Sequence, residues 1–164
     1  MKKIIFLITS IILFCYLNAC AGYKPIYGSS NFNFIIEDYS IKGEERLANS
    51  IYRNLYNISL SNKNNQAAQS VSLSIDTKKE RIATVKNSAG KILEYEININ
   101  TNIIVKDFLT GKSILNQIFS YSVSYKVQDE HSDTLKLENK NIDNLIDKTY
   151  QDALVKISEV ITSR

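Results

Sequence analysis

The residue whose setting most clearly indicates chemistry is Cys20, which directly follows the small residue Ala19. Leu17 lies three positions before the cysteine. A thiol ionises to a nucleophilic thiolate, which can carry a diacylglyceryl group as a thioether. A small residue just ahead of the thiol fits the binding site of a peptidase. The thiol and its small neighbour therefore mark Cys20 as a candidate site of processing and modification.

The segment before Cys20 has the composition of an export signal. Lys2 and Lys3 form a basic start, and the 14 residues at positions 4–17 are apolar apart from one Thr and one Ser. That length fits the apolar region of a signal peptide and is short of the ~20 residues that span a bilayer. With Cys20, the segment resembles the lipobox of bacterial lipoproteins. The alternatives are a signal without lipid and a short uncleaved anchor, in either of which the cysteine is incidental.

Cleavage changes the composition on which function classes are judged. Residues 1–19 would be removed as the signal peptide, and residues 20–164 would form a single periplasmic domain of 145 residues. The loss of Lys2 and Lys3 lowers the net charge from +3 to +1. Nucleic-acid binding needs a clustered basic face, so a near-neutral domain argues against it. Cys15 leaves with the signal, so we expect no disulfide in the mature domain.

Clusters that suggest catalysis or metal binding are weak. Residues 129–133 combine the single His131 with three carboxylates, but a second His or Cys is missing and adjacent side chains cannot all reach one ion. We interpret this run as a solvated loop. Neither a glycine-rich phosphate loop nor a Ser-His-Asp or Cys-His arrangement is recognisable. We therefore expect no enzyme activity, no cofactor, no metal and no catalytic residue.

Periodicity indicates the elements that make up the domain. Alternating apolar and polar residues predict strands at 32–39, 71–85, 93–105 and 113–127, where Leu93 begins the apolar face of the third strand. Helical spacing predicts a helix at 44–58 and a second, C-terminal helix capped by Ser132 or Asn139. Because each helix has one apolar stripe and the sheet has one apolar face, we predict an α+β two-layer sandwich. Two helices would pack on one face of a four-stranded mixed sheet in the order β-α-β-β-β-α, with the first two strands parallel.

The tyrosines at 52, 56, 121 and 125 lie on the predicted apolar faces, and we interpret them as core rather than as a lipid-binding groove.

The mature N-terminus carries a family resemblance. Residues 20–28, Cys-Ala-Gly-Tyr-Lys-Pro-Ile-Tyr-Gly, resemble the lipidated start of the lipopolysaccharide-assembly lipoprotein LptE family, in its alphaproteobacterial form. Further along, the strand that starts at 93–97, the Ser- and Tyr-rich stretch at 119–125 and the long C-terminal helix are similar to that family.

The resemblance implies a lipid-anchored outer-membrane lipoprotein on the periplasmic face. Such a protein plugs the large β-barrel LptD, assists its assembly and takes part in lipopolysaccharide transport to the outer leaflet. By position, the family's contacts with lipopolysaccharide phosphates fall on Lys86 and Lys91, with Arg81 and Lys79 as neighbours. Lysine supplies a point charge that suits phosphate. The alternative for these residues is that they merely solvate an exposed hairpin.

Two other function classes are compatible with the sequence. One is a lipid-anchored adaptor of another envelope machine, for barrel insertion or phospholipid transport. The other is a lipoprotein hydrolase, which the lack of a recognisable nucleophile arrangement disfavours.

Overall fold

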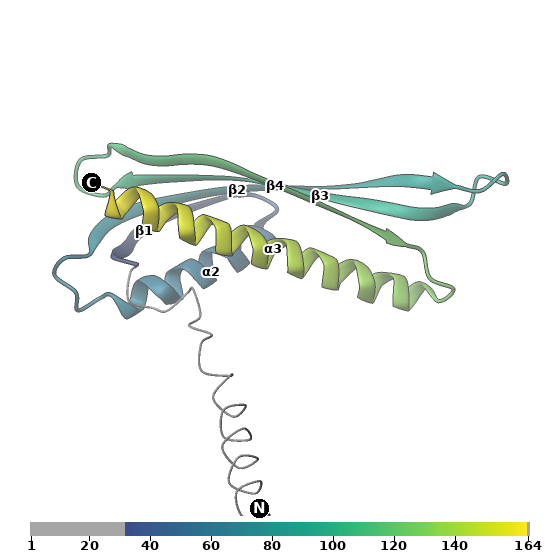
Figure 1. Cartoon of the computed structure of the whole chain (residues 1–164), viewed down its shortest axis with the longest axis horizontal. Coiled ribbons are helices and arrows are strands. Elements are labelled where there is room, and N and C mark those ends of the chain that lie inside the picture. The colour runs from purple at the N-terminus through teal and green to yellow at the C-terminus, as the bar shows by residue number, and fades with distance from the viewer. Residues whose placement is uncertain (1–31, 164) are drawn as a thin grey trace, which may run out of the picture. The chain divides into compact units, whose positions relative to one another are not determined.

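The computed structural model describes residues 32–163, so the predicted signal peptide and Cys20 lie outside the described residues. Six elements follow one another along the chain (Figure 1). They are strand β1 (Phe34–Gly43), helix α2 (Glu45–Ser61), strands β2 (Gln69–Lys86), β3 (Ile92–Asp107) and β4 (Ser113–Lys126), and helix α3 (His131–Thr162). The predicted order of elements is confirmed.

The strands form one mixed sheet in the order β1-β2-β3-β4. β1 and β2 are parallel, whereas β3 runs antiparallel to both of its neighbours, β2 and β4. Parallel neighbours need a crossover connection, and α2 supplies it. α2 packs against β1 and β2, α3 packs against β4 and β3, and both helices cover the same face of the sheet (Figure 1). This is the predicted α+β two-layer sandwich.

The core lies between that covered face and the helices. Alternate residues of the two central strands point into it, which is why those strands have the strict apolar and polar alternation seen in the sequence. At the centre, the hydroxyls of Thr77 and Thr101 are buried opposite each other, 3.2 Å apart, and satisfy each other's hydrogen bonding. The fully buried large side chains are Phe34, Ile51, Leu55, Val71, Ile75, Ile97, Ile99, Ile103, Val105, Ile142, Leu154 and Ile157.

The helices do not cover the whole length of the sheet. Burial on the covered face of β2 ends after Thr77, and on β3 it begins only at Ile97. Residues 79–96, which we call the distal hairpin, therefore extend past most of the core (Figure 1). Leu93 belongs to this part, and it is 42% exposed although its place in the alternation predicts burial. The alternation continues to the end of the strand, but the helical cover does not.

The chain passes from the sheet into a helix at two junctions, at the start of α2 and at the start of α3. Gly43 ends β1 with a φ of +75°, and the N–H of Glu44 then donates to the carbonyl of Thr77 on β2. A residue without Cβ is needed there because the left-handed backbone conformation is costly for other residues. At the start of α3, the predicted N-cap residues are wrong. Ser132 and Asn139 both lie inside α3, which begins one residue after Glu130.

Candidate functional site

The turn of the distal hairpin is held by its own hydrogen bonds. The N–H of Asn87 donates to the carbonyl of Lys91, and the side-chain Oδ1 of Asn87 accepts from the N–H groups of Ala89 and Lys91. Gly90 has a φ of +80°, as expected for the left-handed position of a short hairpin turn. These hydrogen bonds form the turn between β2 and β3 and fix the backbone that carries the two candidate lysines.

The end of the distal hairpin is both cationic and apolar. Lys86 and Lys91 are exposed, and the nearest acidic residue in the sequence is Glu94, which pairs with Val85 across the hairpin. Close to them in the sequence, Ile82, Val85 and Leu93 are between 42% and 47% exposed. Ammonium groups attract phosphate, and exposed apolar side chains bind acyl chains or other apolar surface. The arrangement therefore suits a ligand that carries both phosphate and hydrocarbon.

Arg81 differs from the other candidate cations because it already has partners inside the protein. Its Nε donates to the hydroxyl of Tyr125 at 2.9 Å and lies 3.3 Å from Oε2 of Glu138 on α3. The guanidinium also stacks over the ring of Tyr95, 3.6 Å from its centroid. Lys79, on the same face of β2, is half-buried. Arg81 thus ties the distal hairpin to α3, and a phosphate contact for Arg81 or Lys79 stays a prediction.

Tyrosines complete the contact between the sheet and α3. The hydroxyl of Tyr125 donates to Oε2 of Glu138 at 2.7 Å, and that of Tyr121 donates to Asp152. Burial, followed by the neighbouring carboxylate, raises the pKa of each phenol to about 12. Tyr52, Tyr56 and Tyr121 are partly buried and pack against the core, although Tyr56 also lines a hollow beside α2 and Tyr121 lines one on the sheet. The interpretation of these tyrosines as core agrees with their positions.

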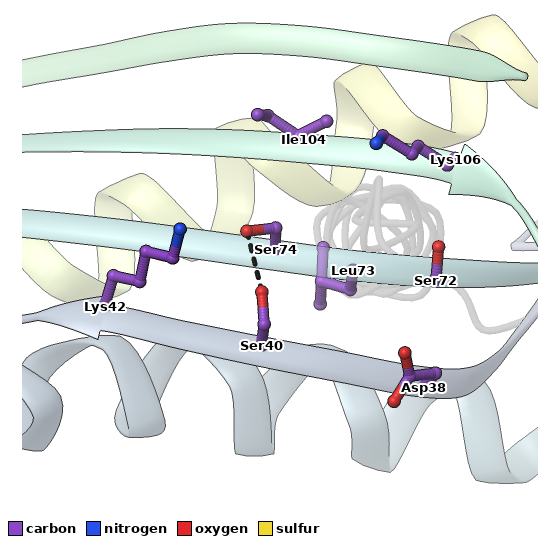
Figure 2. A pocket seen from close by; sticks show the side chains of 8 residues that line it. All are labelled: Asp38, Ser40, Lys42, Ser72, Leu73, Ser74, Ile104 and Lys106. Carbon is purple, nitrogen blue, oxygen red and sulfur yellow. Dashed lines mark hydrogen bonds between the residues drawn. The ribbon is translucent and has the colours of Figure 1, made fainter. Parts of the chain in front are cut away.

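The face of the sheet opposite the helices is open and mostly polar, with Ile104 and the exposed Ile118 among its polar side chains. We call it the uncovered face, and its residues include Ser40, Lys42, Ser72, Ser74, Asp76, Asn98, Asn100, Asn102, Lys106, Ser120 and Ser122. Figure 2 shows a hollow of about 320 Å³ on this face, over β1, β2 and β3. Short hydroxyl side chains line the middle of the hollow, where Ser40 donates to Ser74 at 2.9 Å, and Lys42 and Lys106 reach over it.

The polar side chains of the uncovered face are suited to hydrogen bonding rather than to catalysis. Elsewhere on it, Oδ1 of Asn102 is buried and has no hydrogen-bond partner among the described residues. A buried acceptor without a partner can take a donor from another molecule. Sequence reasoning predicted the polar side chains of this face from the alternation, but their gathering into a hollow depends on the pairing of β1 with β2.

Within residues 32–163, no cluster of three or more His, Cys, Asp or Glu side chains is placed to hold a metal ion. The loop predicted around His131 is instead the start of α3. The described helices are also too polar or too short for any of them to cross a membrane.

Comparison with known proteins places the fold among solved lipoprotein structures. No protein-family model and no curated protein sequence matches the chain. The solution structure of an uncharacterized lipoprotein B from Nitrosomonas europaea has a TM-score of 0.58 at 13% identity, covering 84% of this chain and 90% of that one. A candidate lipoprotein from Caulobacter crescentus has a TM-score of 0.56 at 13% identity, with 78% and 90% covered. A minor lipoprotein from Acinetobacter baumannii has 0.51 at 16%, with 77% and 93% covered.

Proposed function

We propose that this protein is a lipid-anchored lipoprotein of the bacterial outer membrane that works without catalysis, in the manner of LptE. It would plug and help assemble an LptD-type β-barrel and take part in lipopolysaccharide transport to the outer leaflet. The solved structures that share its fold are described as lipoproteins, which supports the class. The lipobox at Cys20 supports the anchor.

The observation that carries the proposal is the free end of the distal hairpin. Lys86 and Lys91 are exposed on either side of a hydrogen-bonded turn and are close in sequence to exposed aliphatic side chains. Lipopolysaccharide carries phosphates beside acyl chains. The free end of the distal hairpin has lysines suited to the phosphates and aliphatic side chains suited to the acyl chains. Charge-assisted contacts to phosphate are stronger than neutral hydrogen bonds, so the two lysines would supply most of the affinity.

The uncovered face supports the barrel as the partner. The lumen of a large barrel is polar, and a body that fills it must present hydrogen-bonding groups rather than apolar surface. Ser, Asn and Lys side chains spread over β1 to β4 do so. Because another polar partner would also fit this face, an adaptor of a different envelope machine is the second candidate.

Lipopolysaccharide binding tests the hairpin. The double variant Lys86→Ala/Lys91→Ala is expected to bind purified lipopolysaccharide about tenfold or more weakly than the unaltered protein, since two charge-assisted contacts are lost. Lys140→Ala/Lys156→Ala removes the same charge from exposed positions of α3 and serves as the control. Equal affinity of the hairpin variant and the unaltered protein, or equal losses in both double variants, would contradict the proposal.

Capture of the tagged, membrane-extracted protein tests the partner. A stoichiometric large β-barrel in the eluate is expected. Recovery of a different envelope complex would favour the adaptor, and turnover of an ester or peptide substrate would favour a hydrolase. Mass spectrometry of the mature N-terminus tests the anchor, and an unmodified Cys20 would refute it.

A further inference from the structure

The turn between β3 and β4 has an unusual composition for a tight turn. Its tip consists of Phe108, which is 48% exposed, and Leu109, which is 86% exposed. Hairpin turns favour Gly, Asn, Asp and Ser, and the other hairpin of this protein follows that rule with Asn87 to Gly90. Leu109 is almost wholly in solvent and has little packing role at the tip, and Phe108 leaves about half of its surface exposed.

The tip is held in place by the residues beneath it. Oδ1 of Asp107 accepts from the N–H and the hydroxyl of Thr110, and its Oδ2 accepts from the side chain of Gln69 on β2. These bonds lower the pKa of Asp107 to about 2, so the carboxylate stays ionised at physiological pH. Gly111 closes the turn with a φ of +68°. The backbone thus presents Phe108 and Leu109 outward from a fixed frame.

This tip lies at the end of the sheet where the described chain begins. The N–H of Gln69 donates to the carbonyl of Asn33, and the N–H of Phe108 donates to the carbonyl of the next β2 residue, Ser70. Eleven residues separate Cys20 from Phe32. Fully extended, that connection reaches at most about 40 Å. A lipid on Cys20 would therefore keep this end of the body close to the bilayer, and the free end of the distal hairpin is the end farthest along the strands from it.

We propose that the tip formed by Phe108 and Leu109 inserts into the interfacial region of the lipid leaflet to which Cys20 is tethered. The proposal rests on the lipid anchoring stated under the proposed function. Aromatic and aliphatic side chains partition into the membrane interface. Lys106 and Lys112 flank the tip in sequence and are exposed, which suits the phosphates of anionic phospholipid.

With the tip inserted, the protein would be attached to the leaflet at two points. Its orientation relative to the bilayer would then be restricted. β3 has 16 residues, which at ~3.4 Å per residue corresponds to a strand of about 54 Å. With the tip in the leaflet, Lys86 and Lys91 would be held at the opposite end of that strand, away from the bilayer surface. The lipid-proximal and ligand-binding ends of the sheet would then be separate.

A single tryptophan tests this inference, because the natural chain contains no tryptophan. Leu109→Trp is introduced into the full, acylated protein, which is then reconstituted into vesicles of phosphatidylethanolamine and phosphatidylglycerol. We expect the Trp emission to shift to shorter wavelength and to be quenched by phospholipids brominated on their acyl chains. Val85→Trp on the distal hairpin is the control, and its emission should resemble that of tryptophan in water and be quenched by aqueous iodide.

The outcomes separate this inference from the proposed function. If the protein floats with the vesicles but position 109 emits as in water, the tip does not insert and the inference is wrong, while the anchor stands. A shift to shorter wavelength without quenching by the brominated lipids would also refute insertion, because it indicates cover by protein. If the protein does not float at all, the lipid anchor itself fails.

Discussion

The ion pair between Arg81 and Glu138 is partly buried. We therefore expect it to stabilise the fold more than an ion pair of similar length that is exposed to solvent. The side chain of Glu138 is only 13% exposed, and that of Arg81 is 37% exposed. Exposed ion pairs contribute about 0.2–1 kcal/mol, whereas breaking a buried pair costs about 3–5 kcal/mol. Between these limits, and allowing for solvent screening at Arg81, we expect a coupling energy of about 1–2 kcal/mol.

A double-mutant cycle measures this coupling. Arg81→Met keeps an apolar stem against Tyr95, and Glu138→Gln keeps an acceptor for the hydroxyl of Tyr125. The free energy of unfolding of both single variants and the double variant comes from urea denaturation followed by circular dichroism. The cycle subtracts the effect of each single change, so the remainder belongs to the pair.

The protein contains a matched control pair. Lys136 and Asp133 lie 3.0 Å apart, closer than Arg81 and Glu138, but their side chains are 78% and 55% exposed. The cycle of Lys136→Met with Asp133→Asn is expected to give at most about 0.5 kcal/mol. If the two pairs give the same coupling energy, burial does not strengthen the Arg81 contact, and its role in tying the distal hairpin to α3 is refuted.

Two further predictions concern the backbone and the phenols. Gly43→Ala should destabilise the protein by about 3 kcal/mol or more, because the added Cβ would lie 2.1 Å from the carbonyl oxygen of Thr77 at a φ of +75°. Gly90→Ala has a similar φ but no atom within 4 Å of the new Cβ, so urea denaturation should show a loss of only about 1–2 kcal/mol; equal losses would exclude the steric explanation. Because folding raises the pKa of Tyr121 and Tyr125 from about 10 to about 12, their contribution to stability is complete below about pH 10 and declines as the pH rises towards about 12. Between these pH values, the melting temperature of Tyr121→Phe/Tyr125→Phe should fall less than that of the unaltered protein. If the melting temperatures of both proteins fall equally with pH, the two tyrosines do not cause the loss of stability.

Much of the fold follows from periodicity in the sequence. The stripe from Tyr95 to Val105 lies on the covered face because a strand alternates with a period of two, whatever packs on it. Irregularities break this rule. The pairing of β3 and β4 shifts register between Val105 and Lys106, and Ile114 is buried although the alternation of β4 assigns the covered face to Leu115. A register shift depends on two strands together, so neither strand's pattern reveals it.

The sequence predicts those parts of the candidate site that depend only on residues close to one another in the chain. Lys86 and Lys91 flank a turn that the intervening residues specify, so their exposure could be expected from the sequence. The partners of Arg81 could not, because Tyr125 and Glu138 lie 44 and 57 positions further along the chain and meet Arg81 only when α3 packs on the sheet. The Phe108 and Leu109 tip is visible in the sequence, but its place beside Ser70 depends on the antiparallel pairing of β2 with β3, and the nearness of Asn33 depends on the parallel pairing of β1 with β2.

That parallel pairing also bears on the order in which the protein forms. Phe34 pairs with Gln69, 35 positions later, whereas β2, β3 and β4 are joined by short turns. Contacts that are near in sequence close at a smaller loop-entropy cost and form faster. β1 must therefore wait for β2, with Phe34 and Ile36 unprotected from aggregation in the meantime. The sheet is completed last at the strand with which the described domain begins.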